Sequence, residues 1–211
     1  MGGVGGVLRR LPVVLTMAGD IVGILLAAGK GRRFGSDKLL HPLPGGTPMA
    51  VAVARKLRQA CGHTIAVLRP EQQTLAALLA AEGYEIRFSV EAEGGMGHSL
   101  AQGVKATPDA AGWLVALADM PFVAAGTFCR VVYALRGGAS LAAPFHEGRR
   151  GHPVGFSREW FGELASLTGD QGARRILAAN PGYLVQVPCN DAGVLVDVDT
   201  PAALAIGPDK P

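Results

Sequence analysis

Apolar runs alternate along this chain with segments in which apolar residues recur at helical spacing. The runs predict β-strands at 20–27, 63–69, 84–90, 113–118, 140–145, 152–157, 183–187 and 194–198. The segments with helical spacing lie at 48–60, 71–82, 98–106, 124–136 and 171–179, and a last short helix is predicted after Pro201. Such alternation is typical of a mainly parallel sheet with helices on both faces. The polar turn at 146–151, between two strands, predicts a small β-hairpin.

Residues 20–206 are predicted to form one domain, because no internal repeat, low-complexity tract or interdomain linker interrupts them. Residues 1–19 differ: Arg9 and Arg10 precede an apolar stretch that Pro12 interrupts, which only partly resembles a signal peptide. We interpret them as a disordered N-terminal extension in which Met17 could be the natural start. No segment contains the roughly 18 consecutive apolar residues of a membrane-spanning helix. We therefore expect a cytoplasmic protein without membrane association.

Composition narrows the class of ligand. Hydrophobic residues make up 49% of the chain and charged residues 18%, which excludes a disordered protein. The net charge of +3 suits a small anionic ligand but is too low, without a basic run, to indicate nucleic acid. Cys61, Cys129 and Cys189 are far apart and form no CxxC pair, so we expect buried free thiols in a reducing compartment.

The loop after the first strand carries the strongest chemical signal. The apolar run 20–28 leads into a loop with glycines at 29, 31 and 35 and with four cations, Lys30, Arg32, Arg33 and Lys38. Glycines let backbone N–H groups approach an anion, and the cations supply charge for a polyphosphate. The loop therefore predicts a nucleotide triphosphate site. The alternative is an ordinary strand-to-helix turn with solvated basic side chains.

Acidic residues follow two other predicted strands. Asp119 comes directly after the apolar strand 113–118, at an edge where it could hold Mg²⁺ or cap the next helix. Asp197 lies in the predicted strand 194–198 and Asp199 directly follows it, so the two residues are two apart and should point the same way. Asp199 could equally cap a helix that begins at Pro201.

Two further segments are weaker candidates. Gly94–Ser99 opens a predicted helix, whose N-terminus offers unpaired N–H groups to a ligand, although Ser99 could simply be the helix cap. His152 lies at a strand start, where histidines are more often packed or exposed than catalytic. No Ser-His-Asp order or cysteine nucleophile motif is visible.

The segment from Leu26 to Lys38 resembles the signature Leu-Ala-Ala-Gly-x-Gly-x-Arg-x-Gly-x-x-Lys of nucleotidyltransferases that activate sugars and cofactors, and it matches at every specified position. Within this MobA-like superfamily, later segments of the chain are similar to the molybdenum cofactor cytidylyltransferases. They are Leu117–Pro121, Asp197–Pro201, Gly94–Ser99 and the pair Gly151–Pro153 with Asp170–Arg174. The resemblance covers about 20–206. It implies a single Rossmann-like three-layer α/β/α domain of the nucleotide-diphospho-sugar transferase type, with a hairpin insertion.

The resemblance also implies roles for individual residues. It places the nucleotide on Leu26, Ala27, Ala28, Gly29, Gly31, Arg33, Lys38, Gly97 and Ser99. It makes Arg33, Lys38 and Asp119 catalytic, with Mg²⁺ on Asp119 and Asp199 and with Asp197 as a weaker candidate. It places His152 and Arg174 on the acceptor side. The implied reaction transfers CMP from CTP to the phosphate of a pterin acceptor, without a covalent intermediate, and a molybdoenzyme or its maturation chaperone would be a partner.

Several alternatives stay open. Ala28, where related guanylyltransferases usually have glycine, favours CTP over GTP because its methyl group narrows the space for a base. Sugar phosphates and polyol phosphates are further acceptors within the superfamily. An NAD(P)-dependent oxidoreductase could use residues 29–35 as a dinucleotide loop and Arg69 for a 2′-phosphate, although no acidic residue closes the second strand. An accessory protein that binds a nucleotide without chemistry is the last alternative.

Overall fold

The computed structural model describes residues 19–29, 34, 37–170, 172–200 and 203–204. Residues 1–18 of the extension predicted at 1–19 lie outside the described residues, as do Gly31, Arg33 and most of the helix predicted after Pro201. Within the described chain, no helix has both the length and the apolar character needed to cross a bilayer.

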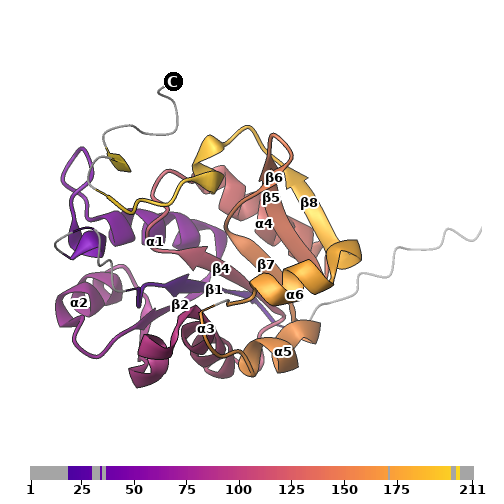
Figure 1. The fold of residues 1–211 in the computed structure, drawn as a ribbon, viewed down its shortest axis with the longest axis horizontal. Helices are drawn as coiled ribbons and strands as arrows, with labels where there is room; N and C mark the ends of the chain where they lie inside the picture. The colour runs from indigo at the N-terminus through magenta and orange to yellow at the C-terminus, as the bar shows by residue number, and fades with distance from the viewer. Residues whose placement is uncertain (1–18, 30–33, 35–36, 171, 201–202, 205–211) are drawn as a thin grey trace, which may run out of the picture.

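A single mixed sheet forms the centre of the domain (Figure 1). The described strands run in the order β3-β2-β1-β4-β7-β5-β6. Strand β8 lies outside this order and pairs with β5. Their bounds are Ile21–Leu26 (β1), His63–Leu68 (β2), Glu85–Phe88 (β3), Gly112–Leu117 (β4), Leu141–His146 (β5), Arg149–Arg150 (β6), Val154–Ser157 (β7) and Leu184–Pro188 (β8). Strands β1 to β4 are mutually parallel, and β8 is parallel to β5. Strand β7 runs antiparallel to β4 and β5, so the predicted hairpin is part of the main sheet.

Helices cover both faces of the sheet (Figure 1). Helices α1 (Met49–Ala60), α2 (Gln73–Ala81) and α4 (Ala125–Arg136) contribute to one apolar core, and α3 (Met96–Lys105), α5 (Phe161–Ala165) and α6 (Arg174–Ala179) to the other. Strand β1 is buried along its whole length, with Leu25 in the first core and Ile24 in the second. Because both faces of β1 are buried, its sequence is a continuous apolar run without alternation of apolar and polar residues. The predicted α/β/α class is confirmed.

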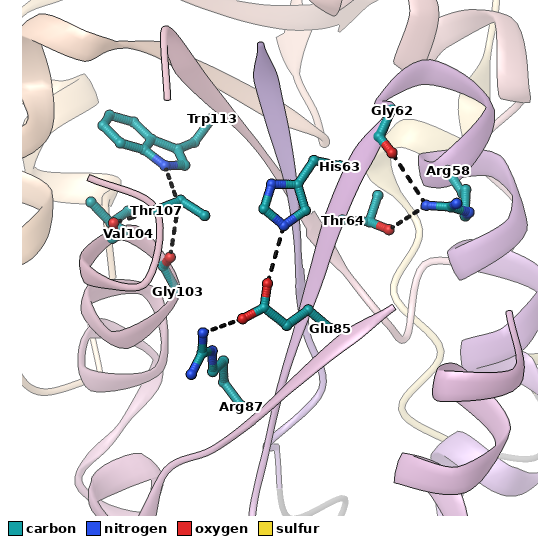
Figure 2. Close-up of polar contacts among 10 residues, drawn as sticks. All are labelled: Arg58, Gly62, His63, Thr64, Glu85, Arg87, Gly103, Val104, Thr107 and Trp113. Atoms are coloured by element: carbon teal, nitrogen blue, oxygen red, sulfur yellow. Dashed lines mark hydrogen bonds and ion pairs between the residues drawn. The ribbon is translucent and has the colours of Figure 1, made fainter. Parts of the chain in front are cut away.

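The amino-terminal edge of the sheet is held by structural contacts (Figure 2). The indole Nε1 of the fully buried Trp113 donates to Thr107 Oγ1 at 3.0 Å. On the neighbouring strands, Glu85 pairs with His63 at 3.1 Å and with Arg87. The described side chains at this edge therefore support the sheet, and the candidate chemistry lies at the opposite, carboxyl edge.

Some predicted elements differ from the structure. Residues 194–198 are not a strand, because the chain forms a 3₁₀ helix at Ala192–Leu195 and Val198 then bonds to the backbone of Asp119. The helix predicted at 171–179 begins at Arg174, and the short helix α5 was not predicted. Of the three free thiols only Cys61 is buried, which raises its pKa to about 12.

Candidate functional site

The start of the glycine-rich loop is held by side chains that follow β2. Gln72 is buried and donates from Nε2 to the carbonyl oxygen of Ala27 at 3.0 Å, while Arg69 Nη1 donates to that of Ala28 at 2.6 Å. These bonds direct the chain out of β1 toward the loop. Among the described residues, a Cβ built on Gly29 would meet no atom within 4 Å. The backbone at 26–29, which is predicted to bind the ligand, is thus held in place by the hydrogen bonds from Gln72 and Arg69.

Lys38 joins two carboxylates from distant parts of the chain. It lies in a 3₁₀ helix at Lys38–Leu40, and its Nζ donates to Asp119 Oδ2 at 2.8 Å and to Asp199 Oδ1 at 2.9 Å. The backbone N–H of Val198 donates to the carbonyl oxygen of Asp119 at 2.9 Å, which brings the two acidic segments side by side. The residues predicted from three separate motifs therefore meet at one place.

The ion pairs determine the charge of Lys38. Burial lowers its pKa, but hydrogen bonds and charges from Asp119 and Asp199 outweigh burial, and the pKa is raised above its ordinary value. The ammonium is therefore fully charged at neutral pH. Only 7% of Lys38 is exposed, because its carboxylate partners hold it inward, so the alternative of a turn with solvated basic side chains does not apply to this residue.

Asp119 is not the cap of the helix that follows it, α4. The N-terminus of α4 is capped by Asp191, whose Oδ2 accepts a bond from the Ala124 N–H at 3.0 Å. Near the predicted last helix, Thr200 Oγ1 accepts the N–H of Ala203 at 3.3 Å. Asp119 and Asp199 both pair with Lys38 at this edge.

The pair fits a divalent cation. Two carboxylates converge on a single positive group, and carboxylate oxygens are the ligands that Mg²⁺ prefers. In the described residues no group of three or more histidine, cysteine or acidic side chains could hold a metal. Mg²⁺ commonly uses one or two carboxylates and takes its other oxygens from phosphates and water, so this sparse site is of the expected kind.

A pocket of about 570 Å³ opens beside this cluster. Leu26 and Leu117 line it, and they end the two strands that the glycine-rich loop and Asp119 follow directly. Its floor is apolar, and its polar lining is Arg150, His152, Asp170, Arg174 and Arg175. The structure therefore brings the predicted acceptor residues His152 and Arg174 into one pocket. Arg150 and Gln72 were not predicted as parts of the site, because nothing local in the sequence relates them to it. Arg69 was considered only as a 2′-phosphate contact in the oxidoreductase alternative.

His152 is the most unusual group of the pocket. Its Nδ1 is buried and has no hydrogen-bond partner among the described residues. Burial and the charge of Arg150 lower its pKa to about 4, although Asp119 and Asp197 oppose this shift. The imidazole is therefore neutral at physiological pH. Asp197 acts on His152 and is exposed, while Asp199 holds Lys38, so the two acidic residues face different groups.

The predicted base contacts lie at the start of α3. Gly97 is buried, and its N–H donates to the carbonyl oxygen of Gly169 at 2.8 Å. A Cβ at Gly97 would lie 2.7 Å from the carbonyl oxygen of Thr168, so only glycine fits there. Ser99 is 3% exposed. The structure thus gives Gly97 a packing role against the 168–170 loop, and contact of Gly97 or Ser99 with a base stays a prediction.

The lowered pKa of His152 predicts a pH dependence of stability. The unfolded chain takes up a proton near pH 6.5 and the folded protein only near pH 4. The free energy of unfolding should therefore fall as the pH drops through this window, by at most about 3 kcal/mol for this group. In His152→Gln this part of the dependence should vanish, as measured by urea unfolding at pH 7, 5.5 and 4.5. An identical pH dependence in both proteins, or an imidazole that titrates above pH 6 by NMR, would contradict it.

Comparisons with known proteins identify the family of this chain. A family model described as "MobA-like NTP transferase domain" matches residues 23–184. The chain is 34% identical over 191 residues to "Purine catabolism protein PucB" of Bacillus subtilis, covering 86% of this chain and 92% of that protein. It is 32% identical over 188 residues to "Nicotine blue oxidoreductase" of Paenarthrobacter nicotinovorans, covering 85% and 92%.

Solved structures with the same fold include Rv0371c from Mycobacterium tuberculosis H37Rv. It superposes with a TM-score of 0.77 at 29% identity, covering 89% of this chain and 96% of that one. A second structure of Rv0371c, in complex with manganese, gives a TM-score of 0.73 at 28% identity and covers 88% and 96%. A molybdopterin-guanine dinucleotide biosynthesis protein A from Archaeoglobus fulgidus has a TM-score of 0.63 at 20% identity, which shows a shared fold alone.

Proposed function

This chain belongs to the MobA-like NTP transferase family of nucleotidyltransferases, and from that premise we propose that it transfers CMP from CTP to the terminal phosphate of molybdenum cofactor, with release of pyrophosphate. The observation that carries the proposal is the meeting of Lys38, Asp119 and Asp199 beside a pocket with an apolar floor and basic residues. A phosphorylated ring system needs such a combination of apolar surface and positive charge.

In the proposed reaction the acceptor phosphate attacks the α-phosphorus of the nucleotide in line. A new P–O bond forms there, the bond between the α-phosphorus and its bridging oxygen breaks, and pyrophosphate leaves. Lys38 has three N–H donors, of which two meet carboxylates among the described residues, so the third can meet a phosphate oxygen. Arg33, which lies outside the described residues, would add charge to the departing pyrophosphate. Catalysis then consists of positioning and electrostatic stabilisation.

Asp119 and Asp199 would hold Mg²⁺ or a similar divalent ion. When bound, such an ion offsets the negative charge that gathers on the phosphates. The manganese complex of Rv0371c supports the use of a divalent metal by a similar protein. Both carboxylates are partly exposed, with side-chain exposures of 28% for Asp119 and 49% for Asp199, so a cation can reach them from solvent.

The pocket beside the cluster would hold the acceptor. Arg150 and Arg174 would meet its phosphate, and the apolar floor would meet a flat ring. The neutral His152 would offer a hydrogen bond rather than a charge. A molybdoenzyme or its maturation chaperone would receive the product.

CTP should be the preferred nucleotide over GTP. Ala28 is buried, and its carbonyl oxygen is held by Arg69, so its methyl group has a fixed place at the start of the loop. A purine needs more room there than a pyrimidine. The test is a pyrophosphate-release assay that pairs each nucleoside triphosphate with molybdenum cofactor, a sugar phosphate and a polyol phosphate. Equal or faster turnover with GTP and molybdenum cofactor would overturn the nucleotide, and turnover only with another acceptor would overturn the acceptor.

A second candidate function is an oxidoreductase, which the likeness to nicotine blue oxidoreductase favours. The proposed contact of Arg69 with a 2′-phosphate is weakened, because the guanidinium already binds the carbonyl of Ala28 and lies 2.5 Å from Glu71. Oxidation of NADH and NADPH, followed by absorbance with a panel of quinone-like dyes, would detect this activity. Hydride transfer that is fast and independent of divalent metal would favour the oxidoreductase over the transferase.

A further inference from the structure

We propose that Lys56 and Asp191 are positioning residues that hold Asp119 and Asp199 in register with each other. This inference rests on the proposed function, because its importance depends on the two carboxylates acting together. Neither residue contacts Lys38 or lines the pocket beside it. Both act through the backbone of the segments that carry the carboxylates.

Lys56 holds the loop that follows Asp119. It projects from α1, and its Nζ donates to the carbonyl oxygens of Pro121 at 2.6 Å and Val123 at 2.9 Å. Burial lowers the pKa of Lys56, which the charge of Asp191 partly opposes. A partly buried ammonium that binds two carbonyls of one turn fixes the course of that turn, since moving it would leave the charge without partners.

Asp191 joins the same loop to the segment that carries Asp199. Its Oδ2 accepts bonds from the Ala124 N–H at 3.0 Å and from Thr127 Oγ1 at 2.5 Å. Asp191 therefore anchors the beginning of a short segment, and Asp199 lies at the end of it. Lys56 binds the carbonyl oxygen of Val123 and Asp191 binds the N–H of the next residue, Ala124, so the two anchors are neighbours.

The two segments also touch between these anchors. A Cβ at Gly193 would lie 2.3 Å from the carbonyl oxygen of Phe122, so the backbones are in direct contact there. Near the carboxylates, Val198 donates to the backbone of Asp119 at 2.9 Å. The loop at 119–124 and the segment at 191–199 thus run together from the anchors to the site. A displacement at Lys56 or Asp191 should therefore change the distance between the two carboxylates. A change in this distance would lower the affinity for a cation that both carboxylates bind.

The test compares Lys56→Met with Arg55→Met. Methionine keeps the apolar stem of Lys56 and removes both bonds to the loop. Arg55 directly precedes Lys56 in the same helix. Its exposed guanidinium pairs with Glu82 at 2.7 Å, away from the loop. Mn²⁺ affinity is measured by electron paramagnetic resonance with CTP present, together with kcat, KM and Tm. We expect Lys56→Met and Asp191→Asn each to weaken Mn²⁺ binding about tenfold, the scale for groups that support metal ligands. Arg55→Met should leave it unchanged, and Lys56→Arg, which can still donate to both carbonyls, should restore most of it.

A second readout does not depend on the proposed function. Amide hydrogen exchange should quicken in Lys56→Met both at 119–124, which Lys56 contacts, and at 196–200, which it does not. The double variant with Asp191→Asn should weaken Mn²⁺ binding by less than the product of the single effects, since both act on one loop. Unchanged exchange at 196–200 would overturn the positioning role, and so would unchanged Mn²⁺ affinity in both single variants where the unsubstituted protein binds the ion. Failure of the unsubstituted protein to bind Mn²⁺ with any nucleotide would overturn the proposed function instead, and the exchange data would still decide the positioning role.

Discussion

Asp119→Asn should fold normally and lose nearly all metal-dependent transfer. The Asp119 backbone directly follows β4 and accepts the bond from Val198, so the position of the side chain is fixed by the sheet and by its neighbour. Asparagine keeps the shape but removes the negative charge that a hard cation needs. Because Asp191 caps α4, the substitution does not disturb a helix terminus. We expect a loss of more than about hundredfold in kcat/KM, or about 3 kcal/mol, with Tm changed by only a few degrees.

The comparison of Asp119→Asn with Asp199→Asn and Asp197→Asn identifies the second ligand. Asp199 shares the ammonium of Lys38 with Asp119, whereas Asp197 acts on His152. Asp199→Asn should therefore show the same pattern less severely, since the Asp199 side chain is 49% exposed against 28% for Asp119, and Asp197→Asn should lose least. Pyrophosphate release at several Mg²⁺ concentrations measures all three. Full activity in Asp119→Asn, or a larger loss in Asp197→Asn than in Asp199→Asn, would overturn this assignment.

Lys38→Met should slow turnover strongly and also change its pH dependence. The substitution removes a phosphate contact, for which a loss of about tenfold to hundredfold is the usual scale. It also leaves Asp119 and Asp199 side by side without their shared cation. Like charges at short range raise a carboxyl pKa, so the residual activity should need a higher pH than that of the unsubstituted protein. The measurements are kcat and the KM for CTP between pH 5 and 9.

The free energy of unfolding of Lys38→Met distinguishes a phosphate contact of Lys38 from a purely structural role. Its carboxylate partners are partly exposed and screened by solvent, so we expect the free energy of unfolding to fall by only about 1–2 kcal/mol. Lys105→Met on the exposed side of α3 is the control and should change neither activity nor the pH profile. Turnover at low CTP equal to that of the unsubstituted protein would exclude Lys38 from the triphosphate site, and an unfolded variant would make it structural.

The local residues of the site were predictable because each follows an apolar strand. The run ending at Ala28 and the run ending at Ala118 both mark carboxyl ends of buried parallel strands, and such ends meet at one edge of the sheet. Asp119 and the glycine-rich loop could therefore be placed together from sequence. The prediction of a strand at 194–198 was wrong. An apolar run in the sequence does not reveal whether a neighbouring strand has a free edge with which the run could pair.

The sequence by itself determined the α/β/α class, the position of the glycine-rich loop and the acidic residues that lie near it. Those features depend on the order of apolar and polar residues along the chain, and each can be inferred from a short stretch of neighbouring residues. Only the tertiary structure decided that Lys38 is buried between Asp119 and Asp199 and that His152 is neutral in a pocket with Arg150. The contacts of Gln72, Lys56 and Asp191 likewise join segments between 45 and 67 residues apart. Hydrogen bonds, burial and charge act through space, so these properties exist only once the chain has folded.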